Sequence, residues 1–148
     1  MPTVQSVADV LEKNSDGAIA DWLCRVNAQP DIISISLTPE DRCAHLPQML
    51  RDTVVRLRSP LPLGTRTLIS DAADYHGGKR REQGYSASML VEESRMLQVA
   101  IFETLQRHLQ DMDSALLLGD IMTIADEVDS QLAQAMSSFL FEPKPTVK

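Results

Sequence analysis

Four polar side chains lie close to a break in the sequence that is marked by Gly84: they are His76, Arg80, Tyr85 and Glu93. His76 and Arg80 are one helical turn apart, so they share a face of one predicted helix. Glu93 lies on the apolar stripe that runs through Leu90 and Leu97 in the next helix. An ionised carboxylate on such a stripe must find partners or become neutral, because an unpaired buried charge is costly. If the two helices pack antiparallel, Glu93 can meet Arg80 or His76, and an arginine–carboxylate pair satisfies both charges.

These residue types allow several kinds of site. Histidine, arginine and glutamate together could transfer protons, but the sequence shows no nucleophile, metal-ligand set or phosphate loop beside them, so we expect no enzyme activity. The histidines, His45, His76 and His108, fall on different predicted helices without the i,i+4 spacing of a metal site, and no metal is predicted. A structural clamp between two helices and a ligand- or signal-responsive site both remain open. His76 is also the one candidate for an axial haem ligand.

The spacing of apolar residues predicts the elements that position this cluster. It indicates helices over residues 3–27, from 38 to the connector 59–64, and over 67–83, 87–110 and 114–141. These five helices predict a single all-α bundle over residues 1–141, with 142–148 as a linker or frayed tail. Trp22, in the middle of the first apolar stripe, is predicted to anchor the core.

Breaks and connectors are also predicted. The Asn14–Gly17 stretch should kink the first helix or start a new one at Ser15. Thr38 and Pro39 form a strong helix start, and Pro47 should kink the helix that follows. Residues 29–37 are predicted to be an extended loop packed on the core.

The last helix carries a heptad-like apolar seam, which Ile124 and Met136 widen and which consists of Ile121, Ala125, Val128, Leu132, Ala135 and Phe139. Asp126, Glu127, Asp129 and Gln131 are predicted to lie outside this seam. Such a seam can pair two chains or pass a movement to a following domain.

Composition limits the class of partner. The chain has 148 residues, of which 43% are hydrophobic and 24% charged, and its net charge is −7. An acidic protein is a poor ligand for nucleic acid or an anionic membrane, so neither is an expected partner. Cys24 and Cys43 form no ligand pattern and are expected to be reduced thiols. No signal peptide or membrane-spanning run is predicted, and we expect a cytoplasmic protein.

The pattern His76-Gly-x-x-Arg80-x-x-x-Gly84-Tyr85-Ser86, followed by Met89-Leu90 and Glu93-x-Arg95-x-Leu97, resembles a known family. It is similar to the N-terminal domain of RsbR/RsbD-type co-antagonist proteins, which also occurs ahead of bacterial sensor histidine kinases. The likeness extends over nearly the whole chain. Two positions depart from the family pattern: Ser94 stands where an aromatic residue is common, and Gln98 where an arginine is common.

The resemblance implies a non-catalytic sensory or regulatory input domain of a bacterial stress-response or two-component protein. It further implies a dimeric, globin-like fold without haem, and an output partner that is a STAS domain or a histidine kinase. Its signalling residues would be His76, Arg80, Gly84, Tyr85, Glu93 and Arg95. A globin-like sensor that binds haem or a small ligand is the alternative, and a helical enzyme such as a metal-dependent hydrolase is a third.

Overall fold

The computed structural model describes residues 4–59, 61–65 and 70–141, and this part of the chain is all-helical. The helices are α1 (Val7–Lys13), α2 (Ser15–Asn27), α3 (Pro30–Ile33), α4 (Pro39–Cys43), α5 (Leu46–Arg58), α6 (Asp71–Glu82), α7 (Ala87–Gln106) and α8 (Ser114–Leu140). A 3-10 turn, η1 (Leu109–Asp111), joins α7 to α8. The predicted all-α class is therefore confirmed, while the predicted tail at 142–148 lies outside the described residues.

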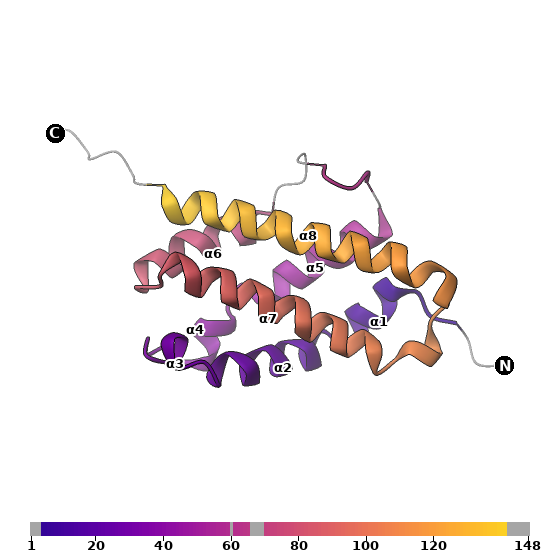
Figure 1. The fold of residues 1–148 in the computed structure, drawn as a ribbon, viewed down its shortest axis with the longest axis horizontal. Coiled ribbons are helices and arrows are strands. Elements are labelled where there is room, and N and C mark those ends of the chain that lie inside the picture. The colour runs from indigo at the N-terminus through magenta and orange to yellow at the C-terminus, as the bar shows by residue number, and fades with distance from the viewer. Residues whose placement is uncertain (1–3, 60, 66–69, 142–148) are drawn as a thin grey trace.

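The two longest helices organise the bundle. Helices α7 and α8 run antiparallel side by side along its length (Figure 1). Helix α6 packs on α8, and α2 packs on α7. Helices α1 and α5 pack on each other and complete the core, while α3 and α4 lie beside α2 at one end (Figure 1).

Local chemistry breaks the first predicted helix into α1 and α2. The Asn14 side-chain amide donates to the Val10 carbonyl at 2.7 Å, and the Ser15 hydroxyl donates to the Leu11 carbonyl at 3.0 Å. Such side-chain bonds compete with the helix ladder, and here they accompany the start of a new helix at Ser15. The predicted interruption at this point is confirmed.

Two prolines begin helices where the sequence predicted something else. Pro47 lies in the first turn of α5, where a missing backbone N–H costs nothing, so it starts a helix instead of kinking one. Pro30 likewise begins the short helix α3, and the prediction of an extended loop over residues 29–37 was wrong in that part. The chain is therefore divided more finely than the five predicted helices.

The break between α6 and α7 lies at Gly84, where the sequence predicted it. Gly84 adopts a φ of 93°, a left-handed conformation that suits glycine at the end of a helix. The Ser86 hydroxyl then caps α7 by accepting the Met89 N–H at 3.2 Å. Helix α6 is described from Asp71 onward, and residues 67–69 of the predicted helix over 67–83 lie outside the described residues.

Trp22 anchors the core as predicted. Its side chain is 1% exposed, and its indole N–H donates to the backbone carbonyl of Glu93 at 2.9 Å. That bond ties α2 to α7 at the residue that carries the buried carboxylate. Among the described helices, none is long and apolar enough to cross a membrane.

The buried face of helix α8 coincides only in part with the predicted seam. Val128 and Ala135 of the seam are buried, and so is Ile124, which was predicted to widen it, but Ile121, Ala125, Leu132 and Phe139 are only half-buried. The row that faces the core consists of Ile124, Glu127, Val128, Gln131 and Ala135. The prediction that Glu127 and Gln131 lie outside was wrong, because both find polar partners in the core.

Candidate functional site

The predicted polar cluster forms, and Glu93 is at its centre. Its carboxylate is nearly inaccessible, with 3% of the side chain exposed. One oxygen, Oε1, accepts the Arg80 Nε–H at 2.9 Å, and the other, Oε2, accepts the Tyr85 hydroxyl at 2.9 Å. His76 Nε2 lies 3.7 Å from Oε1. The cluster therefore joins α6 to α7 across the Gly84 break.

Arg80 extends the cluster to other elements. Its guanidinium also donates to the backbone carbonyl of Arg42 at 2.5 Å and to the Gln83 side chain at 2.7 Å. The guanidinium carbon lies 4.7 Å from the centre of the Tyr85 ring, a cation–π distance. These contacts occupy all three guanidinium nitrogens, so Arg80 is held rigidly.

Arg42 belongs to the cluster, and sequence reasoning missed it. This α4 side chain is 5% exposed and donates to the Tyr85 hydroxyl at 2.5 Å and to the Ile35 carbonyl at 2.6 Å. The sequence spacing could have revealed its burial. Arg42 precedes the buried Leu46 by one helical turn, so a single helix through both residues would place Arg42 on the core face.

His45, on α5's N-terminal side, packs against His76. Their Nδ1 atoms lie 3.4 Å apart, so one ring can donate to the other when both are neutral. The His45 ring also contacts Tyr75, with 5.0 Å between the ring centres. Burial lowers the pKa of His45 to about 4, assisted by the charges of His76, Arg80 and Lys79. The neutral form of His45 is therefore favoured down to mildly acidic pH.

The electrostatics of the cluster fix two more protonation states. Burial by itself raises the pKa of Glu93, but His76 and Arg80 outweigh that effect, and the net direction is downward. Burial, followed by the charge of Glu93, raises the pKa of Tyr85 above its ordinary value. At neutral pH Glu93 is thus an anion that accepts hydrogen bonds, and Tyr85 is a neutral donor.

Gly77 brings the helix that carries the cluster into direct contact with α8. A Cβ atom at Gly77 would lie only 1.8 Å from the backbone oxygen of Ala135. Glycine is thus required at this crossing, immediately after His76, because any side chain would push the helices apart. The adjacent Gly78 has more room, since the nearest atom to its Cβ position is the Ser138 hydroxyl at 3.3 Å.

A second buried cluster lies between α5 and α8, and the sequence did not reveal it. Arg56, with 1% of its side chain exposed, pairs with Asp126 at 2.8 Å and with Glu127 at 3.3 Å. The Gln131 amide donates to Glu127 at 2.9 Å and to the Met49 carbonyl at 3.1 Å. Burial raises the pKa of Glu127, although Gln131 and Arg56 partly offset this. The two clusters lie at different junctions of the same core.

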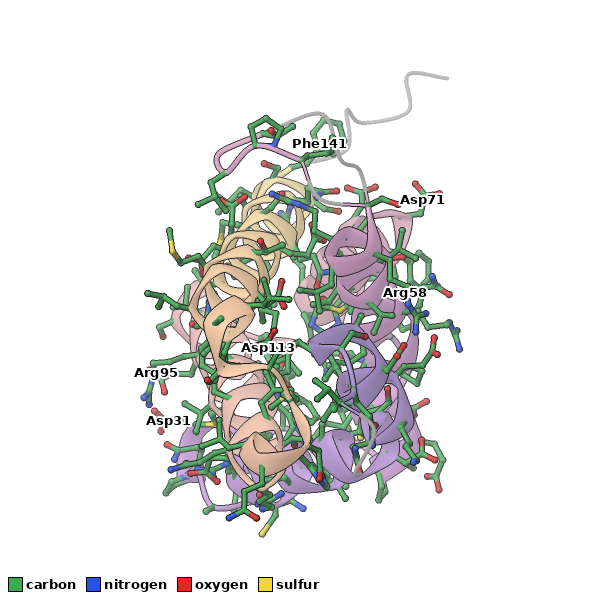
Figure 2. All side chains as sticks on the ribbon, turned by 90° about the vertical axis from the view of Figure 1, so that its right-hand side faces the viewer. Asp31, Arg58, Asp71, Arg95, Asp113 and Phe141 are labelled. Carbon is green, nitrogen blue, oxygen red and sulfur yellow. The ribbon has the colours of Figure 1, made fainter. Side chains whose placement is uncertain are left out.

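Arg95 does not join the cluster. It extends from the surface of α7 (Figure 2) and pairs with Glu92 at 2.8 Å, with 62% of its side chain exposed. Ser94 and Gln98, the two departures from the family pattern, both lie on the α7–α8 side. Ser94 borders a core cavity, and Gln98 donates to Asp129 on α8 at 3.0 Å.

The chemistry that this arrangement supports is the fixing of helix positions by buried charge. In the part of the chain that the structure describes, no group of three or more His, Cys, Asp or Glu side chains is placed to hold a metal ion. The core cavity beside the cluster offers about 20 Å³ for water-sized molecules and is bordered by His76, Glu93, Ser94 and Gln131 among apolar side chains. In comparisons with known proteins, no family model, no curated protein and no solved structure matches the chain.

Proposed function

We propose that this chain is a non-catalytic sensory or regulatory input domain of a bacterial stress-response or two-component signalling protein. The proposed assembly is a cytoplasmic homodimer, and the proposed output partner is a STAS domain or a histidine kinase. The likeness to the N-terminal domain of RsbR/RsbD-type co-antagonists suggests this role. The observation that carries it is the buried Glu93 cluster. The Glu93 carboxylate links α6 to α7, and α6 also touches α8 through Gly77.

The proposed mechanism is a shift between two packings of α6, α7 and α8. Ion pairs that are fully buried have strict geometry, so a change at His76, Arg80 or Glu93 must be absorbed by a movement of the helices that carry them. Gly77 leaves α6 no clearance from α8, so α8 follows such a movement. The half-buried seam on α8 then passes the change to a second chain or to an output domain.

Light scattering over a concentration series tests the proposal. The wild-type chain should form a dimer, and Glu93→Gln should change the dimer dissociation constant by about tenfold or more. Glu92→Gln, which alters a neighbouring surface carboxylate, is the matched control and should leave the constant unchanged. Tyr85→Phe removes one hydrogen bond to Glu93 and serves as a milder variant if Glu93→Gln does not fold. A wild-type monomer at every concentration, or variants that dimerise like wild type, would contradict the proposal.

The alternative, a globin-like haem sensor, meets a geometric obstacle at its candidate ligand. His76 is engaged by His45 on one side and faces Glu93 on the other. The cavity beside it, about 20 Å³, is far below the several hundred Å³ of a pocket for an organic cofactor. Added hemin should therefore produce no absorption band that His76→Ala removes. A band of that kind would restore the haem alternative.

A further inference from the structure

A small cavity lies in the core where α2, α5, α6, α7 and α8 meet, and residues of both buried clusters border it. Most of its wall is apolar and includes Trp22 and Leu97. His76 and Glu93 belong to the first cluster, and Gln131 belongs to the second. The space available to water-sized molecules is about 20 Å³, whereas one water needs roughly 10–15 Å³. The cavity therefore has the size of a site for a single water molecule.

Gln131 presents an unsatisfied acceptor in this region. Its side chain is fully buried, and no donor among the described residues reaches its Oε1 atom. The orientation of the amide is fixed, because Nε2 donates to the Met49 carbonyl and the Glu127 carboxylate. Turning the amide over would place Oε1 against those two acceptors. Leaving a buried acceptor without a donor is unfavourable, so Oε1 requires a partner that the protein itself does not supply.

The same cavity is bordered by His76 and Glu93, whose nearest polar atoms do not form a direct hydrogen bond. His76 Nε2 and Glu93 Oε1 are 3.7 Å apart, which is too long for a direct hydrogen bond. Polar groups at such a separation are commonly bridged by water. Four polar side chains border the cavity, those of His76, Glu93, Ser94 and Gln131. They can supply the roughly three hydrogen bonds that a buried water usually makes.

We propose that the cavity is a binding site for one water molecule that connects the two buried clusters. The water donates one hydrogen to Gln131 Oε1 and the other to the Glu93 carboxylate, and it accepts the His76 Nε2–H. This bridge links the α6–α7 cluster to the α5–α8 cluster. It deepens the function proposed above and rests on it in one respect: it gives α8 a polar connection to the site where the signal would act.

The cavity borders the surface at one edge. Ser94 of α7 and Leu132 of α8, both half-buried, line it there. Leu132 belongs to the α8 seam, so a second chain packed on that seam would cover the edge. The bound water should therefore exchange with solvent more slowly in a dimer than in a monomer.

A crystal structure of the full chain with ordered solvent tests the site directly. We expect one water within about 3.2 Å of Gln131 Oε1 and within hydrogen-bonding distance of His76 Nε2 or Glu93. An empty cavity, or a Gln131 Oε1 atom paired with a protein donor, would overturn the inference. This readout is independent of dimerisation: a monomer that contains the water would refute the proposed function and leave the hydration site intact.

Filling the cavity distinguishes a hydrated site from a dry one. Ser94→Val, which adds one heavy atom of about the size of a water, should displace the water and leave Gln131 Oε1 without a donor, so the melting temperature should fall by about 4 °C or more. Ser137→Val, at an exposed position of α8, is the matched control for the change of side chain. In a dry cavity of this size the added methyl group would gain contacts instead. A melting temperature of Ser94→Val equal to or above that of the control contradicts the proposal.

A double-mutant cycle tests whether the water couples the clusters. Tyr85→Phe perturbs the first cluster, and Gln131→Leu removes the acceptor in the second. Their effects on the unfolding equilibrium constant should depart from multiplicativity by about fivefold. A cycle of Tyr85→Phe with Arg58→Gln, which alters an exposed ion pair of α5 with α1, should be multiplicative. Multiplicative behaviour in both cycles would refute the coupling.

Discussion

Glu93 keeps its charge in the core because a cation, a phenol hydroxyl and an imidazole surround it. Neither Arg80 nor Glu93 could be buried alone, because the free energy needed to remove a lone charge from water exceeds the stabilisation gained by packing one side chain. Their direct contact, with 1% and 3% of the side chains exposed, makes each residue dependent on the other. Changes at this residue scale should therefore have large effects, while changes at neighbouring surface charges should not.

Replacing Glu93 with glutamine should destabilise the protein by about 3 kcal/mol, because Arg80 then remains buried without a counter-charge. The surface pair Glu92–Arg95 provides the control: Glu92→Gln should cost about 0.5 kcal/mol or less. Urea unfolding of both variants measures the difference. Equal stabilities of Glu93→Gln and Glu92→Gln would show that the buried pair does not stabilise the fold.

His45 should make the fold sensitive to mild acid. Its pKa is about 4 in the folded chain, against 6.5 for the free side chain, so the unfolded chain takes up a proton that the folded chain resists. Stability should therefore fall as the pH decreases from about 6.5 toward 4. The lowered pKa of Glu93 adds a further loss only below its ordinary value of 4.5. Replacing His45 with glutamine should reduce the slope of stability between pH 7 and 5, as measured by urea midpoints, and an unchanged slope would contradict this assignment.

At the scale of the elements, sequence periodicity predicted the long helical segments, though not α3, and which residues meet at the break. His76, Arg80, Tyr85 and Glu93 come together because helical spacing and a glycine turn are local properties. Arg42 and the Arg56–Glu127–Gln131 cluster were missed for a physical reason. A charged residue on a helix is solvated in most proteins, and only the tertiary packing of α4, α5 and α8 supplies the partners that allow its burial.

The crossing of α6 and α8 depends on one glycine. Gly77→Ala would place a Cβ atom 1.8 Å from the Ala135 oxygen, and a backbone atom cannot move aside as a side chain can. The variant should lose about 2 kcal/mol or more, despite the better helix propensity of alanine. Gly78→Ala meets only the Ser138 hydroxyl at 3.3 Å and should be neutral or gain up to about 1 kcal/mol. Thermal unfolding of the two variants compares them, and similar melting temperatures would argue against tight contact at this crossing.

At the scale of the whole molecule, exposed apolar side chains gather on one flank of helix α8. The helix buries one row of side chains in the core. Beside α7 it leaves partly exposed a second, apolar flank that includes Ile121, Ala125 and Leu132 of α8. Leu118 continues this flank, since it lies three and seven residues before Ile121 and Ala125, and it is 69% exposed. A contiguous apolar flank on a helix that runs the length of the bundle is the surface that the proposed dimer would use (Figure 1).

A charge on this flank should separate the dimer without harming the monomer. Leu118→Glu changes an exposed side chain, so the fold should persist, but a carboxylate buried between two chains would be unpaired. The dimer dissociation constant measured by light scattering should rise about tenfold or more. Leu116→Glu is the matched control, because Leu116 is also exposed, at 63%, yet lies roughly 200° around the helix from Leu118. If both variants dimerise like wild type, the dimer uses another surface. If Leu116→Glu alone weakens the dimer, the interface lies on the opposite flank of α8. The proposed route from the Glu93 cluster through the seam would then be wrong.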